Sequence, residues 1–276
     1  MKIAAYEYDN KRSVMVANAV MQGCRKLGIN CQVQSTSKYR YPDSDVAIFY
    51  GYGERLRKIM ADYKTQGKIA VAVDIGYFGR KKGKDGYHRI SVNDRHPDKY
   101  FQKTKHPDDR LRKFNINLKP YRKNGKHILL GGMSAKAAGV YGYKANEFEK
   151  KTLVELRKNS GRKIVYRPKP SWNKAIPLAG ASFSKNDLDY DLRDCHAVVV
   201  NHSNLAIDAL IGGVPVFTRV GCVATPMGLQ DLTKIESPYY PEDRYQWLCD
   251  VCYCQYNLEE ISEGMLIKYL EKEGFL

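Results

Sequence analysis

The sequence predicts an α/β protein built from two Rossmann-like, doubly wound halves with a cleft between them. Short apolar runs alternate with amphipathic helical stretches along most of the 276 residues, and this length suits two small α/β domains. A basic, proline-punctuated stretch at residues 95–125 interrupts the pattern and reads as an extended loop or a few short helices. We therefore expect one domain with its linker at residues 1–125 and a second at residues 126–276.

The spacing of apolar residues predicts each element of the first half. Helical spacing from Lys11 to Leu27 indicates an amphipathic helix that Gly28 ends. The nearly uninterrupted apolar run from Lys68 to Val73 is typical of a strand buried on both faces in a parallel sheet. The expected elements, in order, are a strand at 1–6, a helix at 11–27, strands at 31–34 and 45–50, a helix at 54–63 and a strand at 68–73.

The second half starts with an apolar run that ends at Gly131-Gly132. Near the C-terminus, Asn257 and Glu260 have the spacing of a capping box, which predicts the start of the last helix. The expected elements, in order, are a strand at 126–130, a helix at 145–159, a strand at 163–166, a helix at 186–194, a strand at 195–200, a helix from about 204, a strand at 214–217 and helices at 241–254 and 258–270.

Residues 198–217 read as a strand, a polar turn, a short helix and a second strand. Ser203 can cap the helix, and the backbone N–H groups behind it would then form an anion site that suits a phosphate. Asp208, one turn further on, could accept hydrogen bonds from a ribose. An ordinary αβ unit, with Ser203 only a cap and Asp208 only a solvated side chain, explains the same pattern.

The order of Ser203, Asp208-Ala209-Leu210 and Gly213-Val214-Pro215-Val216 resembles the donor-nucleotide segment of GT-B glycosyltransferases. The closest resemblance is to the capsule-polysaccharide transferases that move Kdo. This resemblance implies a GT-B-like fold and a nucleotide sugar, a UDP-sugar or a CMP-sugar, as the donor substrate. It also implies that Ser203 and Asp208 hold the phosphate and the ribose, although the family usually has Glu where this chain has Asp208. His202 and Asn204, beside Ser203, join the predicted donor site.

A second stretch that resembles this family is Arg167-Pro168-Lys169-Pro170. The family has a Lys or Arg, Pro, His, Pro run there, and its cationic side chain faces the donor phosphate. Lys169 stands in place of that His and could neutralise the leaving phosphate, but it cannot act as a near-neutral acid. A surface turn accounts for the run equally well. Residues 253–264 also resemble the terminal segment of the capsule transferases.

Asp74 is the strongest candidate for a general base. It follows the apolar strand at 68–73, and the carboxyl ends of parallel strands are where ligands meet such sheets. A carboxylate in this position could take the proton from an acceptor hydroxyl. The alternative is that Asp74 caps the turn that follows the strand.

The basic charge lies in the first half of the chain. Residues 1–130 hold 28 Lys+Arg and 12 Asp+Glu, whereas residues 131–276 hold 18 of each, so the whole net charge of +16 falls before residue 131. The segment Arg80–Lys126 has 16 basic and 5 acidic residues interleaved with aromatic ones, a composition suited to a polyanion. The predicted acceptor-binding residues are Arg80, Lys81, Lys82, Lys84 and Arg89. A solvated basic loop without a partner is the alternative.

Charge density favours DNA with a hydroxylated, for example hydroxymethyl, base as the acceptor, as in the phage enzymes that glycosylate their own genomes. The resemblance instead favours a transferase that acts on an anionic capsule or lipid-linked glycan. A non-enzymatic nucleic-acid-binding module is a third possibility. The oligomeric state, the sugar and the nucleotide base stay open.

Other features limit the remaining possibilities. The chain has no run of eighteen apolar residues and starts with a strand rather than a signal peptide, so we expect no membrane insertion and a cytoplasmic protein, in the host cytoplasm if a phage encodes it. We expect no bound cofactor and no metal, because the Asp-x-Asp pairs at 43–45 and 187–189 suit solvated loops. Core packing explains Cys249, Cys252 and Cys254 better than metal binding.

Overall fold

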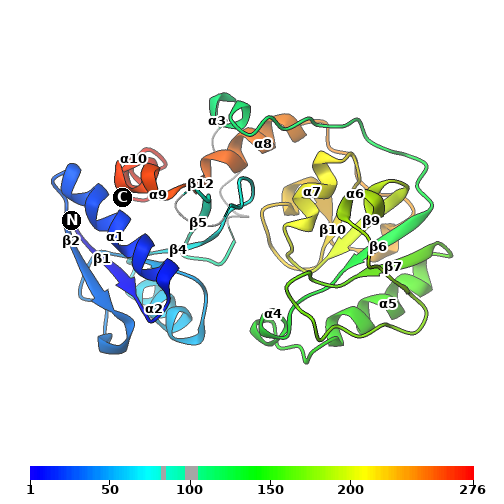
Figure 1. Ribbon diagram of the computed structural model, residues 1–276, viewed down its shortest axis with the longest axis horizontal. Coiled ribbons are helices and arrows are strands. Elements are labelled where there is room, and N and C mark those ends of the chain that lie inside the picture. Colours follow the sequence, from blue (N-terminus) through cyan, green and yellow to red (C-terminus); the bar gives the residue numbers. More distant parts are fainter. Residues whose placement is uncertain (82–84, 97–104) are drawn as a thin grey trace. The chain divides into compact units, whose positions relative to one another are not determined.

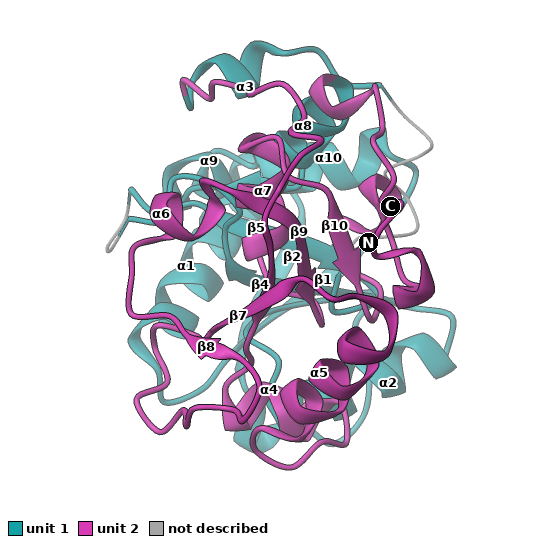
Figure 2. Cartoon of the chain, turned by 90° about the vertical axis from the view of Figure 1, so that its right-hand side faces the viewer, with its two compact units in different colours: residues 1–114, 246–276 teal, residues 115–245 magenta. Residues whose placement is uncertain are grey.

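The computed structural model describes residues 1–81, 85–96 and 105–276, which form two compact units with one six-stranded sheet each. Unit 1 consists of Met1–Phe114 and Gln246–Leu276, and unit 2 consists of Asn115–Tyr245 (Figure 2). The predicted α/β class with two Rossmann-like halves is confirmed.

The sheet of unit 1 is mostly parallel. Its strands, in chain order, are β1 (Lys2–Glu7), β2 (Asn30–Ser35), β3 (Val46–Tyr50), β4 (Ile69–Ile75), β5 (His88–Val92) and β12 (Gln255–Tyr256). They lie in the order β12-β5-β4-β3-β1-β2, with β1 to β4 parallel and β5 antiparallel to both of its neighbours. The carboxyl ends of β1, β3 and β4 therefore meet at one edge of the sheet. Strand β5 was not among the elements predicted from the sequence.

The helices predicted in unit 1 at 11–27, 54–63 and 241–254 are present with nearly the expected bounds. The helices are α1 (Lys11–Lys26), α2 (Glu54–Thr65), α3 (Asp109–Arg112), α8 (Arg244–Tyr253, which starts at the end of unit 2), α9 (Leu258–Ser262) and α10 (Met265–Lys272), with a 3-10 turn at Thr36–Lys38. The Asn10 side chain caps α1 by accepting hydrogen bonds from the N–H groups of Arg12 and Ser13, at 3.0 and 3.2 Å. The predicted helix at 258–270 is divided, because Gly264 takes a φ of +81° between α9 and α10.

The C-terminal segment corrects the predicted domain boundary. Residues 246–276 were expected in the second domain, but β12 pairs with β5 and the helices α9 and α10 pack against α1 in unit 1 (Figure 1). Gly23 of α1 makes this packing possible, since a Cβ there would lie 2.4 Å from the carbonyl oxygen of Ile261. The predicted capping box of Asn257 and Glu260 starts α9, as expected. Cys249, Cys252 and Cys254 are buried in unit 1, as the core-packing interpretation predicts.

The corrected boundary removes the partition of charge between the two halves. The C-terminal segment contributes six acidic and two basic residues to unit 1. Unit 1 therefore has 26 Lys+Arg and 18 Asp+Glu, whereas unit 2 has 20 and 12, so each carries a net charge of +8. Net charge does not distinguish an acceptor unit from a donor unit.

Unit 2 contains a fully parallel sheet. Its strands are β6 (His127–Gly131), β7 (Lys163–Arg167), β8 (Ser182–Phe183), β9 (Cys195–Val200), β10 (Val216–Thr218) and β11 (Gly228–Leu229), in the order β11-β10-β9-β6-β7-β8. Its helices are α4 (Ala135–Val140), α5 (Glu147–Asn159), α6 (Leu188–Leu192) and α7 (Leu205–Ile211), with 3-10 turns at Thr225–Met227 and Leu232–Lys234. Every residue of β9 is buried, as expected for a central parallel strand.

Candidate active site

Asp74 lies near the carboxyl end of β4, and its side chain is 31% exposed. One carboxylate oxygen accepts a hydrogen bond from the Ile75 N–H at 2.8 Å, and the other accepts one from Arg89 at 3.2 Å. Desolvation raises the pKa of Asp74, but the Arg89 guanidinium and the Ile75 amide outweigh it and hold the pKa below its ordinary value. The carboxylate is therefore fixed in place, ionised and partly open to solvent.

Arg89 has a different place from the one expected of an acceptor-binding residue on a basic surface. It is 8% exposed, lies opposite Asp74 on β5, and also makes a 2.7 Å hydrogen bond with Nδ1 of His96. Strand β5 buries the side chain, which corrects its assignment as a surface cation. Its guanidinium holds one oxygen of the Asp74 carboxylate in place through the 3.2 Å hydrogen bond.

Arg80 and Lys81, two of the other predicted acceptor residues, lie in the loop that follows β4. Arg80 and Lys81 are exposed, and the Arg80 side chain donates to the Tyr77 carbonyl at 2.9 Å. Lys82 and Lys84 lie outside the described residues. Gln255 of β12 accepts hydrogen bonds from the backbone N–H groups of Tyr77 and Phe78, at 2.8 and 3.0 Å, so the C-terminal segment holds the start of the loop that follows Asp74.

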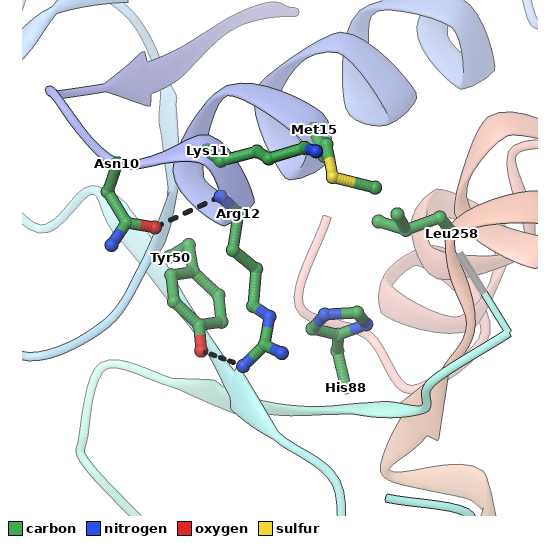
Figure 3. A pocket seen from close by; sticks show the side chains of 7 residues that line it. All are labelled: Asn10, Lys11, Arg12, Met15, Tyr50, His88 and Leu258. Carbon is green, nitrogen blue, oxygen red and sulfur yellow. Dashed lines mark hydrogen bonds between the residues drawn. The ribbon is translucent and has the colours of Figure 1, made fainter. Parts of the chain in front are cut away.

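A cavity of about 430 Å³ opens at the same edge of the sheet (Figure 3). Residues from the first turn of α1, the end of β3, the start of β5 and the start of α9 line it: Asn10, Lys11, Arg12, Met15, Tyr50, His88 and Leu258. Arg12 donates a 3.0 Å hydrogen bond to the Tyr50 hydroxyl. Burial and then the Arg12 cation lower the pKa of His88 to about 4, against a weaker opposing effect of Asp74, so its ring is neutral at pH 7. The sequence analysis missed this cavity.

The first turn of α7 in unit 2 differs from the anion site expected there. The N-cap of α7 is Asn204, and Ser203 lies just before it, where its hydroxyl oxygen accepts a hydrogen bond from the Leu205 N–H at 3.2 Å. However, the N–H of Ala206 donates to the Ser203 carbonyl, and those of Ile207 and Asp208 donate to the Asn204 carbonyl. These amides are therefore already used within the turn, which corrects the prediction that they point free at a phosphate. The Ser203 hydroxyl keeps its own proton for donation.

The other predicted donor residues lie along the carboxyl edge of this sheet. Lys169 follows β7 and is exposed, whereas His202 follows β9 and Asp208 is half-buried on α7. Strands β7 and β9 lie on either side of β6. Their carboxyl ends, which lead into the segments with Lys169 and Ser203, are therefore two strand spacings apart, about 10 Å. The Asn201 side-chain N–H donates to Nδ1 of His202 at 3.1 Å, so the neutral His202 ring carries its proton on Nε2.

Between these two strand ends, a buried carboxylate fixes the turn after β6. Glu149 of α5 is 1% exposed and accepts a 2.6 Å hydrogen bond from the Met133 N–H. Burial raises the pKa of Glu149. Gly132 is required here, because a Cβ would lie 2.9 Å from the Tyr166 ring. Glu149 was predicted only as part of a helix; no sequence signal identified its contact with the turn.

The described residues contain no group of three or more His, Cys, Asp or Glu side chains that could hold a metal ion. Within the same part of the chain, no helix is both long enough and apolar enough to cross a membrane.

The comparison with known proteins supports the fold. No protein-family model and no curated protein sequence matches the chain. Among solved structures, it is similar to Thermosulfurimonas dismutans KpsC described as a β-Kdo 2,7 transferase, with 14% identity and a TM-score of 0.55 over 97% of this chain and 100% of that chain. The same organism's KpsC described as a β-Kdo 2,4 transferase gives 11% and 0.54 over 93% and 92%. At these identities the likeness shows the fold alone, and the GT-B fold expected from the sequence is confirmed.

Proposed function

We propose that the chain is a glycosyltransferase that moves a sugar from a nucleotide sugar, held by unit 2, to a hydroxyl of an anionic glycan, held by unit 1. The observation that carries this proposal is the Asp74 carboxylate, which Arg89 and the Ile75 amide keep ionised at the carboxyl edge of the unit 1 sheet. Two solved structures of similar fold are described as Kdo transferases, which supports the same class of reaction.

The proposed reaction is a single displacement at the anomeric carbon of the donor sugar. Asp74 takes the proton of the acceptor hydroxyl while the oxygen of that hydroxyl bonds to the anomeric carbon and forms the new glycosidic bond. The bond from the anomeric carbon to the nucleotide's phosphate oxygen breaks, and the nucleotide leaves with that electron pair. Lys169 and the Ser203 hydroxyl stabilise the charge on the departing phosphate, and Asp208 accepts hydrogen bonds from the ribose.

An anionic glycan is a better-supported acceptor than DNA. The DNA hypothesis depends on a basic first half and a neutral second half, but the two units carry equal net charges. Of its five acceptor residues, Arg89 is buried against Asp74, and Lys82 and Lys84 lie outside the described residues. The cavity at the carboxyl edge of the unit 1 sheet suits a small ligand better than a duplex.

The donor site is tested by the binding of nucleotide sugars to an Asp208→Ala variant. The variant should lose roughly 1 to 3 kcal/mol of binding free energy, because a charged hydrogen bond to the ribose is removed. Calorimetry with a panel of UDP-sugars and CMP-sugars measures this loss. Asp189→Ala is the matched control, since Asp189 is exposed on α6 and precedes β9. Equal donor affinity in wild type and Asp208→Ala, with an intact fold, would refute the donor site.

The acceptor is tested by transfer of a radiolabelled sugar in parallel reactions with an acidic oligosaccharide and with duplex DNA that contains hydroxymethylated bases. We expect label in the oligosaccharide. Label in DNA, together with DNA binding that weakens steeply with salt, would favour the DNA hypothesis instead.

A further inference from the structure

The first turn of α1 presents two cations where a helix normally favours anions. Lys11 and Arg12 start the helix, its first turn has no acidic residue, and the last turn carries Arg25 and Lys26. Cations stabilise the C-terminal end of a helix dipole and destabilise the N-terminal end. The positions of Arg25 and Lys26 therefore agree with the dipole, whereas those of Lys11 and Arg12 oppose it. An anion bound at the N-terminal end of α1 would neutralise the charge of Lys11 and Arg12 and interact favourably with the helix dipole.

The cations have no acidic partner within the described residues. The Arg12 side chain makes one hydrogen bond in this part of the chain, to the Tyr50 hydroxyl, and neither Lys11 nor Arg12 forms an ion pair there. The bond to Tyr50 uses one N–H of a guanidinium that has five, and it fixes the direction of the group. A guanidinium held in this way can bind a carboxylate or a phosphate through two parallel hydrogen bonds.

The cavity beside Arg12 has both a polar and an apolar side. His88 lies beside the Arg12 guanidinium (Figure 3). Its ring packs against the Tyr50 ring in a T-shaped arrangement, with the two ring centroids 6.0 Å apart. His88 is 3% exposed, and its Nδ1 has no hydrogen-bond partner among the described residues. Met15 and Leu258 supply apolar surface. Two cations, two aromatic rings and an apolar wall together suit a sugar that carries one acidic group.

The volume limits the size of the ligand. About 430 Å³ falls within the range of roughly 300 to 1,000 Å³ typical of small-molecule sites. The cavity therefore accommodates one or two sugar units rather than a polymer strand. Asp74 is close enough that its charge helps to raise the pKa of Tyr50, after the larger effect of burial and against the hydrogen bond from Arg12. Tyr50 pairs with Val73 and His88 with Ile75, so the cavity and the Asp74 side chain lie on opposite faces of the sheet, and binding at Arg12 does not by itself place the sugar at Asp74.

We propose that Arg12, Lys11, Tyr50 and His88 form a binding site for the terminal sugar of an acidic glycan, and that Arg12 binds the carboxylate or phosphate of that sugar. This inference rests on the proposed function for the role of the sugar as acceptor, but binding itself does not require transfer. In the bound state the acidic group neutralises the amino end of α1.

The test is a calorimetric titration of the full chain with glucuronate, glucose 6-phosphate and neutral glucose, in the absence of nucleotide sugar. Wild type should bind at least one of the two acids more tightly than glucose, and the preferred acid identifies the group that Arg12 recognises. In Arg12→Gln the affinity for that acid should fall roughly 10- to 150-fold, as expected when a hydrogen bond to a charged group is lost. Glucose affinity should be unchanged.

Matched variants separate this site from a general effect of charge. Arg25→Gln removes the same cation from the exposed last turn of the same helix and should leave all affinities unchanged. Lys11→Gln, at an exposed position that the fold does not depend on, should weaken the acid by a smaller factor. Equal wild-type affinities for glucose and both acids, or equal losses in Arg12→Gln and Arg25→Gln, would overturn the site.

The outcome is independent of the donor experiment. If acids bind through Arg12 but no nucleotide sugar binds unit 2, the proposed transferase function fails and the acid site stands. If nucleotide sugars bind and the acids are not distinguished from glucose, the acid site fails and the transferase function stands.

Discussion

Asp74→Asn is expected to lower turnover by roughly 10²- to 10⁴-fold, the usual contribution of a positioned general base. The amide has nearly the same shape as the carboxylate and can still accept the hydrogen bond from Arg89, but it cannot take a proton. Steady-state kinetics with a saturating nucleotide sugar measures the loss. Donor affinity should be unchanged, because the proposed donor residues all belong to unit 2.

Asp45→Asn is the matched control for this prediction. Asp45 is exposed and precedes β3, at the amino edge of the same sheet, where its carboxylate accepts a hydrogen bond from the Lys2 backbone at 2.7 Å. This variant should keep its turnover. Near wild-type turnover in Asp74→Asn would mean that Asp74 is only a cap for its turn.

The pH dependence of the reaction tests the role of Arg89. Because the pKa of Asp74 lies below its ordinary value, we expect the acid limb of kcat/KM to lie below the pKa of an unperturbed aspartate, so that the base is fully ionised at neutral pH. In Arg89→Gln the desolvation of Asp74 is opposed less strongly, so its pKa should rise and the acid limb should move toward neutral pH. Arg89→Lys should restore part of the shift. An unchanged pH profile in Arg89→Gln would contradict the positioning role.

The elements that carry a regular apolar pattern could be predicted from the sequence. Helix α1 has a full apolar stripe, a cap at Asn10 and a stop at Gly28, and its predicted and observed ends differ by one residue. Strand β5 was missed because the sequence around His88 and Arg89 puts polar residues in a buried strand. Those two side chains are buried because they interact with Asp74 and the cavity, and no local pattern contains that information.

The domain boundary could not be predicted, for a related reason. The return of residues 246–276 to unit 1 depends on long-range contacts: Gln255 with the loop after Asp74, and α9 against Gly23. From the sequence alone, a glycine inside a helix indicates only a small loss of helix stability. In the structure, Gly23 leaves the space that the carbonyl group of Ile261, 238 residues further along the chain, occupies. The cavity residues were missed for the same reason, since α1, β3, β5 and α9 each contribute one or a few of them.

Arg110→Met is expected to destabilise unit 1 by roughly 3 to 5 kcal/mol, the usual cost of removing one partner from a buried ion pair. Arg110 is 3% exposed and donates to the Gln255 carbonyl and the Glu260 carboxylate at 2.7 and 2.8 Å. It also donates to the Cys252 carbonyl at 3.1 Å, and its guanidinium lies 4.6 Å from the centre of the Tyr256 ring. Methionine fills similar space but removes the charged donor to the Glu260 carboxylate and the donor to two carbonyls, and leaves the carboxylate with the Asn257 N–H.

Unit 1 must be followed separately from unit 2, because the two can unfold in different transitions. The chain has two tryptophans, Trp172 in unit 2 and Trp247 in α8 of unit 1. In a Trp172→Phe background, the fluorescence of the buried Trp247 therefore reports the urea-induced unfolding of unit 1 alone.

Arg112→Met is the matched control, on the same short helix. Arg112 pairs with Asp108 at 2.9 Å, but its side chain is 75% exposed, so the loss should be at most about 1 kcal/mol. Adding Glu260→Gln to Arg110→Met should recover part of the stability, because the unpaired buried charge is then removed. Similar losses in Arg110→Met and Arg112→Met would show that Arg110 does not join the C-terminal segment to unit 1.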